Sequence, residues 1–528
     1  MNNGRTETYR RFALQAAVLG WVAVAVFWLF YAADYYLMPQ PGAPAFSDPF
    51  TRYFAFDPST DSIASLVGVN VAVFGIVITV VSIIVQLSAD RYTGVARMFL
   101  RDRLNIRVAA YYVVTCVASV WLAASGHADY VPRITLFAML SLTMGGLVIT
   151  MPYFGYVFWF LEPQNLVRHI RRDASASAEN GALQHDEQAC FAAQAKTLFA
   201  LEELTDIANN SISGKDKIIA SASVDALKDF AIDYLKLKPQ AGAAWFTLGP
   251  ELRQNPDFVA MDTESLSDLV ERRTWIEWKV MRQYLSIYNE ALSSMRDINY
   301  VIAIDTRYIG EAACEAKDSA LVALVFRFFN SYLRSTLNAR DVRTTYNVLN
   351  QYRKLNESML TLGNAEAAIE GVRHMKYYGL MSFESDLSFV TETVAYDLAA
   401  LAQLANECGS PAEQQILADF LELDRPPFVR GQDRALMGVR KAQVKLAAYY
   451  ISTDQLSRAR AIADDMREEP LERLRNIRRQ LDAVENKDFW EIIDRGRNFE
   501  YMPPQQRECL ATFFDWFDLE EPAVATPP

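Results

Sequence analysis

The residues that could support catalysis or metal binding are few and widely spaced. No histidine has another three or four residues away, which is the spacing of a helical metal-binding pair; the four are His127, His169, His185 and His374. Ser213-Gly214-Lys215 lacks the upstream glycine of a phosphate-binding loop, and no Gly-x-Ser-x-Gly sequence occurs. The sequence therefore contains no pattern typical of an activated nucleophile, a bound metal or a nucleotide.

Carboxylates and thiols lead to the same expectation. Adjacent pairs such as Asp464-Asp465 and Glu202-Glu203 are typical of solvated helix faces rather than of acid–base dyads. Asp206, Asp225 and Asp229 could meet in the folded chain, although nothing in their spacing selects them. The five cysteines are odd in number and far apart, which favours free thiols in a reducing cytoplasm. We expect no enzymatic activity, no cofactor and no metal.

The apolar residues divide the chain into two parts. Of the 528 residues, 51 % are hydrophobic, and they crowd into the first 162 positions. The rest has ordinary globular composition and holds the excess of acidic residues that gives the whole chain its net charge of −12. Because nucleic-acid binding needs clustered Lys and Arg, we expect no nucleic-acid partner.

Four apolar runs near the N-terminus are long enough to cross a bilayer. A hydrocarbon core of about 30 Å needs about 20 helical residues. The predicted spans are 12–38, 63–87, 108–125 and 134–161, within a transmembrane domain over residues 1–172. The first run is too long for the apolar core of a cleaved signal peptide. The sequence therefore predicts a four-helix membrane anchor.

Basic residues in the short loops indicate the orientation of this anchor. The loop after the second span carries five arginines, namely Arg91, Arg97, Arg101, Arg103 and Arg107. The loops after the first and third spans carry only Arg52 and Arg133. The excess of arginine marks the cytoplasmic side, so we expect both termini and the 88–107 loop in the cytoplasm.

The five arginines of the 88–107 loop allow three interpretations. They could bind anionic lipid headgroups, at about 1 kcal/mol for each basic residue near the surface. They could instead dock the acidic part of the chain. They could also do no more than fix the topology, since the asymmetry rule alone predicts such a cluster.

Uncharged polar and small residues within the spans are candidates for a pore or for helix packing. The second span holds Asn70, Thr79, Ser82 and Gln86, and the fourth holds Gly145 and Gly146. Polar uncharged side chains can line water, as in a channel. The interpretation that we favour is hydrogen bonding and close packing between helices. A homo-oligomer built on the second span is the alternative.

A local resemblance concerns the end of the second span and the loop after it. Gln86-Leu-Ser-Ala-Asp-Arg-Tyr92 and the later Phe99-Leu-Arg-Asp-Arg103 resemble the signature loop of a family of predicted bacterial inner-membrane proteins of unknown function. The likeness covers about 63–172. It departs at 89–95, where that family typically has a small-Ser-Gln-Phe-Ser/Gly-Pro-Arg stretch. The resemblance implies an integral protein of the bacterial inner membrane and implies no activity.

The remaining sequence predicts a second, all-α domain. Small polar residues at 173–182 indicate a linker, helical periodicity runs through 183–519, and 520–528 reads as a disordered tail. We expect a helical bundle or an irregular α-solenoid. Residues 440–471 resemble one tetratricopeptide unit, with Tyr450, Ala459 and Ala463 at the positions of close helix contact.

Two functions of different classes are consistent with these features. The first is a membrane-anchored protein whose cytoplasmic helical domain serves as a protein-interaction or sensing module. The second is a homo-oligomeric channel or transporter whose pore is lined by the second span. An interaction module needs a specific partner, such as a cytoplasmic protein, whereas a channel needs several copies of the chain.

Overall fold

A computed structural model describes residues 62–89, 99–100, 102–124, 133–424, 433–488, 495–496 and 498–517, with five isolated positions between 14 and 25. Its described residues form helices and turns and contain no strand. The chain divides into an N-terminal unit, Met1–His169, and a C-terminal unit, Ile170–Pro528. The prediction of an all-α protein is therefore confirmed.

The N-terminal unit contains three long apolar helices that pack on one another. They are α3 (Ser62–Ala89), α5 (Arg103–Ala124) and α6 (Arg133–Leu161). Among the described residues, these three are long and apolar enough to cross a membrane. They coincide with the predicted spans 63–87, 108–125 and 134–161. The predicted span 12–38 lies almost wholly outside the described residues.

The segment 173–182, predicted to be a small polar linker, is helical. It forms the second half of α7 (Pro163–Ala182), and the boundary between the two units falls inside this helix. Ala174, Ala178 and Ala182 are all buried, at the four-residue spacing of one helix face. A small-residue composition suggests a flexible linker, but alanine is also the strongest helix former.

The C-terminal unit begins with two long helices and a cluster of short ones. The long ones are α8 (Glu187–Ser213) and α9 (Lys217–Leu237). The short elements are η1 (Lys238–Gln240), α10 (Ala243–Phe246), α11 (Pro250–Gln254), α12 (Pro256–Val259) and α13 (Thr263–Glu271). Trp245 of α10 is fully buried, and its indole approaches Trp275 at 5.2 Å between ring centroids.

Six helices of equal length follow. They are α14 (Trp275–Ser294), α15 (Arg296–Glu315), α16 (Ser319–Asn338), α17 (Val342–Thr361), α18 (Ala365–Glu384) and α19 (Ser388–Glu407), each of 20 residues. From α16 to α19 the helices begin 23 residues apart. The C-terminal unit is therefore a tandem helical repeat, and it is more regular than the sequence pattern predicts.

One turn geometry recurs at the ends of α15 to α19. The second residue after each helix has a positive φ, at Lys317, Arg340, Gly363, Asp386 and Gly409, which are also 23 residues apart. In each case the next backbone N–H bonds to a carbonyl five residues back, as in a Schellman motif. At the ends of α15, α16 and α17 that next residue is Asp318, Asp341 or Asn364, whose side chain also caps the following helix.

We expect Arg340→Gly to stabilise the protein. The Arg340 side chain is exposed and its φ is +51°, a conformation that disfavours every residue with a Cβ. The free energy of unfolding should rise by about 1 kcal/mol, measured by denaturant titration of the full chain in detergent. Gly363→Ala is the matched control, since its φ is +77° and an added Cβ meets open space. A shift of both variants in the same direction would contradict this account.

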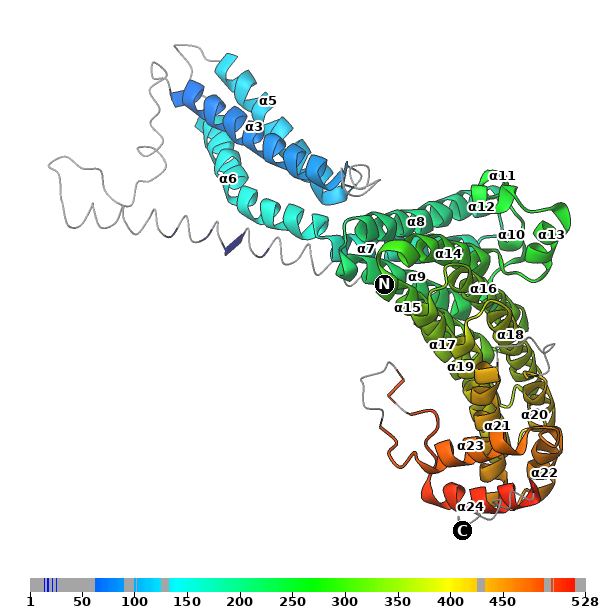
Figure 1. The fold of residues 1–528 in the computed structure, drawn as a ribbon. Coiled ribbons are helices and arrows are strands. Elements are labelled where there is room, and N and C mark those ends of the chain that lie inside the picture. Colours follow the sequence, from blue (N-terminus) through cyan, green and yellow to red (C-terminus); the bar gives the residue numbers. More distant parts are fainter. Residues whose placement is uncertain are drawn as a thin grey trace, which may run out of the picture. The chain divides into compact units, whose positions relative to one another are not determined.

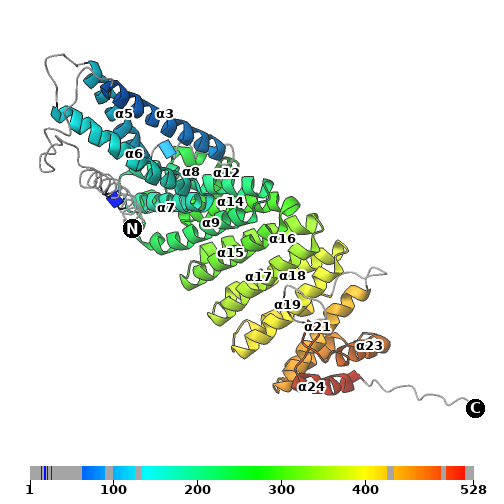
Figure 2. The ribbon, with the colours of Figure 1, turned by 90° about the vertical axis from the view of Figure 1, so that its left-hand side faces the viewer.

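The helices of the repeats form two layers. Each helix packs on the helix two places later in the chain, and these two helices belong to the same layer. One layer contains α9, α15, α17, α19 and α21 (Asp433–Ser452), which lie side by side in Figure 2. The other contains α8, α14, α16, α18 and α20 (Glu413–Leu421). We call these the odd layer and the even layer. This arrangement is an α-solenoid, in which each unit contacts mainly its neighbours.

The unit ends with α22 (Leu456–Asp465), α23 (Leu471–Asp482), α24 (Pro504–Phe514) and η2 (Asp515–Phe517) (Figure 1). Helices α21 and α22 form a hairpin in which Tyr450, Ala459 and Ala463 are buried, as the tetratricopeptide-like pattern predicts. Between α13 and α14 the chain turns at Arg273, which has a positive φ.

Candidate functional site

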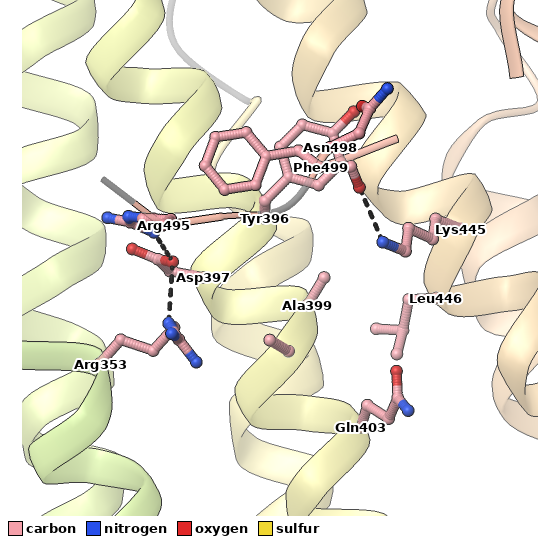
Figure 3. A pocket seen from close by; sticks show the side chains of 11 residues that line it. Arg353, Tyr396, Asp397, Ala399, Gln403, Lys445, Leu446, Arg495, Asn498 and Phe499 are labelled. Atoms are coloured by element: carbon pink, nitrogen blue, oxygen red, sulfur yellow. Dashed lines mark hydrogen bonds and ion pairs between the residues drawn. The ribbon is translucent and has the colours of Figure 1, made fainter. Parts of the chain in front are cut away.

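A cavity of about 170 Å³ opens on the odd layer (Figure 3). It is lined by Arg353 of α17, by Tyr396, Asp397, Ala399, Ala400 and Gln403 of α19, by Lys445 and Leu446 of α21, and by Arg495, Asn498 and Phe499. The last three belong to a group of described residues, 495, 496 and 498–500, that we call the strap. The two alanines create the space, because larger residues on this face of α19 would fill it.

A buried carboxylate with two arginines forms one wall of the cavity. Asp397 is 2 % exposed and its Oδ1 bonds to Nη1 of Arg495, while Nε of Arg353 lies 3.3 Å from the same oxygen. The Arg495 guanidinium also donates to the carbonyl of Tyr346 at 2.9 Å and lies 4.2 Å from that ring centroid. Arg495 therefore ties the strap to α17 and α19.

Aromatic stacking and a lysine form the opposite side of the cavity. The rings of Tyr396 and Phe499 stack at 5.1 Å with an interplanar angle of 8°. Lys445 donates to the carbonyl of Phe499 at 2.7 Å, and Lys441 of the same helix pairs with Glu500. The strap is thus attached at both ends of the cavity.

Three buried polar atoms in the lining have no hydrogen-bond partner within the described part of the chain. They are Oδ2 of Asp397, the hydroxyl of Tyr396 and Nε of Arg495. Burial raises the pKa of Tyr396 well above its ordinary value, and nearby Glu500 and Glu392 raise it further, so the phenol stays neutral. Unpaired buried groups of this kind are costly unless a ligand or water satisfies them.

The lining combines charged, polar and aromatic residues. It includes Asp397, Tyr396 and Lys445, whose residue types can act as general acids or bases, but no histidine, cysteine, serine or threonine among the described residues. Its three cations and one carboxylate give it a positive local charge.

Two of the five candidate arginines lie within the described residues. Arg103 and Arg107 are on the first turns of α5, where both side chains are exposed. Arg91, Arg97 and Arg101 lie outside the described residues. No ion pair or hydrogen bond of Arg103 or Arg107 identifies one of the three roles considered for this cluster.

The Phe-Leu-Arg-Asp-Arg sequence fixes the start of α5 against α6. Phe99 is buried and contacts Phe160 edge to face at 5.7 Å between ring centroids. Asp102 Oδ1 accepts from the backbone N–H of Leu104 at 2.9 Å and from the hydroxyl of Tyr156 at 2.9 Å. The aspartate therefore caps α5 and links it to α6.

We expect Asp102→Ala to lower the stability of the N-terminal unit. The variant loses both the helix cap and the bond from Tyr156, which together should cost about 2 kcal/mol. Asp102→Asn keeps a capping oxygen and should lose much less. The measurement is thermal unfolding of the full chain in detergent. Equal melting temperatures for both variants and the unaltered chain would refute this role.

Three candidate residues of the spans lie at helix contacts. Asn70 of α3 is buried and donates to Ser119 Oγ of α5 at 2.6 Å. A Cβ added at Gly145 would lie 2.8 Å from the Tyr111 hydroxyl, and one at Gly146 would lie 3.3 Å from the Tyr112 ring. These positions bring helices together, in keeping with polar and small residues at membrane helix interfaces.

The other three candidates face away from these contacts. Thr79, Ser82 and Gln86 are exposed on α3. At 100° per residue they share one helix face, roughly opposite Asn70. Gly68 and Gly75 lie on the same exposed face, and a Cβ added at either meets nothing within 4 Å in the described structure.

The other residues considered for catalysis or metal binding are not brought together within the described structure. His374 bonds to the hydroxyl of Tyr352 at 3.1 Å, and burial lowers the pKa of its imidazole. No group of three metal-ligating side chains occurs among the described residues, and all five cysteines are free thiols. Ser213-Gly214-Lys215 forms the turn after α8, where Lys215 has a φ of +58°.

Two groups of candidate carboxylates form ion pairs in the folded chain. Glu202 is not simply solvated, because its carboxylate accepts from the buried ammonium of Lys279 at 2.7 Å. Asp225 and Asp229 do meet, around Lys228, at 3.1 and 3.6 Å from its Nζ. Asp305, which the sequence did not single out, completes this cluster at 3.7 Å.

Comparison with known proteins adds little to this description. No protein-family model matches the chain, and no curated protein matches it significantly. One solved structure, described as a circular tandem repeat protein with novel repeat topology and enhanced subunit contact surfaces, is 12 % identical. The match covers 78 % of this chain and 86 % of that one, with a TM-score of 0.34. At this score the likeness supports no conclusion about fold or function.

The cavity residues were not identifiable from the sequence. Arg353, Asp397, Lys445 and Arg495 span more than 140 positions and occur on four separate segments. The pair Ala399-Ala400 gives no clear sign of a hollow, because α19 also contains Ala395, Ala402 and Ala405.

Proposed function

We propose that this chain is a multi-pass protein of the bacterial inner membrane whose C-terminal solenoid acts in the cytoplasm as a protein-interaction or sensing module. The observation that carries the proposal is the combination, in one chain, of three apolar helices and a long two-layer solenoid. Solenoids present extended surfaces that suit recognition of other macromolecules.

The exposed surface of the N-terminal unit supports residence in a bilayer. Large apolar side chains point outward on all three helices, among them Ile76 at 57 %, Trp121 at 72 % and Met151 at 71 % exposure. Such a surface is unusual for a protein in water but suits contact with lipid. A fourth span at 12–38, cytoplasmic termini and anionic headgroups near the arginine cluster remain parts of this proposal, based on sequence.

The odd layer supports the interaction role. Near its surface, Arg307 donates to the buried Gln351 at 2.8 Å and pairs with the partly buried Glu311 at 2.6 Å. Beside them Tyr308 is 42 % exposed, with the Arg307 guanidinium 4.2 Å from its ring centroid. Exposed tyrosine next to arginine is typical of binding hot spots.

A labelling experiment tests the orientation. Cys408 is exposed at the end of α19, so a membrane-impermeant maleimide should reach it in inverted vesicles and not in intact spheroplasts. Cys408→Ser identifies the labelled site. Labelling of Cys408 in intact spheroplasts would place the solenoid outside the cytoplasm and remove the proposal.

A crosslinking experiment tests the interaction role. A photo-reactive amino acid at Tyr308, on the odd layer, should crosslink a specific protein in living cells. Tyr377 is the control, because it is an exposed tyrosine on α18 of the even layer, at 50 % exposure against 42 % for Tyr308. The same products from both positions, or none from Tyr308, would count against a binding surface on the odd layer.

The second candidate function is a homo-oligomeric channel. The observation that favours it is the exposed face of α3 formed by Gly68, Gly75, Thr79, Ser82 and Gln86, which suits either helix association or a polar pore. A channel predicts several copies per particle in detergent and an ion flux in liposomes that Thr79→Leu reduces. A monomeric mass would exclude it, and the face would then suit packing within one chain.

A further inference from the structure

One face of α5 carries two arginines followed by a row of apolar residues. Arg103 and Arg107 are exposed on the first turns of the helix. At 3.6 residues per turn they share this face with five further exposed residues, namely Ile106, Ala110, Val114, Val117 and Trp121. The buried residues of α5, such as Tyr112 and Ser119, lie on the opposite face. The two arginines therefore meet the same surroundings as the exposed apolar side chains.

The length of this face matches the hydrocarbon core of a bilayer. From Arg103 to Trp121 the helix rises about 27 Å, close to a core thickness of about 30 Å. Tryptophan is enriched at membrane interfaces, so Trp121 suits one edge of the core. The arginines then lie at the other edge, where their long side chains can extend to the lipid headgroups.

Exposed aromatic residues of α6 lie at the same end of the N-terminal unit as the arginines. Asp102, which precedes Arg103, accepts from the hydroxyl of Tyr156 at 2.9 Å, so the start of α5 is adjacent to the end of α6. Phe158 and Trp159 are exposed by 61 % and 45 %. Aromatic and basic residues together are typical of the boundary between hydrocarbon and headgroups.

The two guanidinium groups are available to a common ligand. Neither side chain forms an ion pair or a hydrogen bond with a described residue. Side chains four residues apart on a helix are neighbours, with Cβ atoms about 5–6 Å apart, so Arg103 and Arg107 can contact one headgroup. Guanidinium groups bind phosphate through paired, charge-assisted hydrogen bonds.

We propose that Arg103 and Arg107 together bind the headgroup of an anionic phospholipid in the leaflet beside the start of α5. The acyl chains of this lipid pack along Ile106, Ala110 and Val114. A zwitterionic lipid presents the same phosphate, but its ammonium group opposes the arginines, so a lipid of net negative charge binds more tightly. This inference rests on the proposed membrane residence and specifies the lipid that these two arginines recognise.

Native mass spectrometry of the full chain in detergent tests the assignment. The probes are phosphatidylglycerol and phosphatidylcholine with identical acyl chains. Phosphatidylglycerol should bind at least about tenfold more tightly, because each basic residue near the headgroups contributes about fivefold. Inorganic phosphate at the same concentration should not displace it, because phosphate has no acyl chains to contact α5.

Substitutions locate the site. Arg103→Gln and Arg107→Gln should each lower the preference for phosphatidylglycerol about fivefold, and the double variant should lose it. Both side chains are exposed, so the melting temperature in detergent should stay unchanged and serves as the check on folding. Arg327→Gln, at an exposed arginine on α16 of the solenoid, is the control and should keep the full preference.

Three results would overturn this proposal. Equal binding of the two lipids by the unaltered chain would remove the headgroup preference. A folded double variant that keeps the preference would leave the arginines to the topology or docking roles. Displacement by inorganic phosphate would make this a general anion site.

Carbonate extraction separates this proposal from that of membrane residence. Release of the unaltered chain from isolated membranes by carbonate would refute residence, and the lipid site with it. A chain that stays in the membrane fraction but shows no lipid preference would refute the lipid site alone.

Discussion

The stability of this protein should fall as the pH rises from about 4 to about 7, and Asp305 is expected to be a main cause. The carboxyl of Asp305 is 2 % exposed on α15, and burial raises its pKa from 3.8 to about 7. Lys228 opposes that rise, while Asp225 and Asp229 add to it. The folded state therefore holds a proton that the unfolded chain releases near pH 4.

This bound proton determines whether the free energy of unfolding rises or falls with pH. Between about pH 4 and pH 7 the folded state binds more protons than the unfolded state, so raising the pH favours unfolding. The contribution of the protonated carboxyl is fully present below about pH 4 and is lost as the pH passes 7. A shift of this size corresponds to about 4 kcal/mol in the free energy of unfolding.

The Asp305→Asn variant isolates this effect. Asparagine keeps the shape without the titration, so the variant should match the unaltered chain near pH 4 and exceed its stability by about 2–4 kcal/mol at pH 8. Denaturant titrations of the full chain at several pH values provide the measurement. Glu315→Gln, at an exposed site on the same helix, should leave the pH profile unchanged. Parallel profiles for Asp305→Asn and the unaltered chain would disprove the assignment.

Gly371→Ala should destabilise the solenoid by about 3 kcal/mol. Gly371 lies on α18 against α17, and an added Cβ would lie 2.0 Å from Oδ1 of Asn356. The Asn356 amide is fully buried and donates to the Tyr352 carbonyl at 2.9 Å, so it has little room to move. Overpacking should outweigh the gain of about 1 kcal/mol that alanine brings to a helix.

A double variant tests this explanation for Gly371. Asn356→Ala alone should be destabilising because it leaves a cavity, but combined with Gly371→Ala it removes the collision. The two losses should therefore sum to more than the loss of the double variant, measured by denaturant titration. Strict additivity would show that the collision with Asn356 is not the cause.

The sequence predicts the long apolar helices well because their signal is local. A long apolar run identifies such a helix without knowledge of any partner, and α3, α5 and α6 coincide with three of the predicted spans. The partner of Asn70 was not predictable in the same way. Ser119 lies 49 residues away, and only the packing of α3 on α5 pairs the two side chains.

The regularity of the solenoid was missed because geometry repeats where residue identity does not. Lys317, Arg340, Gly363 and Asp386 share a left-handed conformation but no common side chain. The sequence feature that does indicate the repeat is the set of helix-capping residues at 23-residue intervals, namely Asp318, Asp341 and Asn364. A search for a 34-residue period does not detect it. The cavity depends on this same long-range stacking, which brings Arg495 to Asp397 across 98 positions.

Successive helices of the solenoid alternate between the two layers, so the layer of each helix depends on the number of helices before it. Successive helices are 23 residues apart and belong to opposite layers, so inserting or deleting one helix would send every later helix to the other side. Its buried face would then point to solvent. Homologous solenoids should therefore differ in length by whole helix pairs of 46 residues, and an engineered change of one helix should abolish folding of everything downstream.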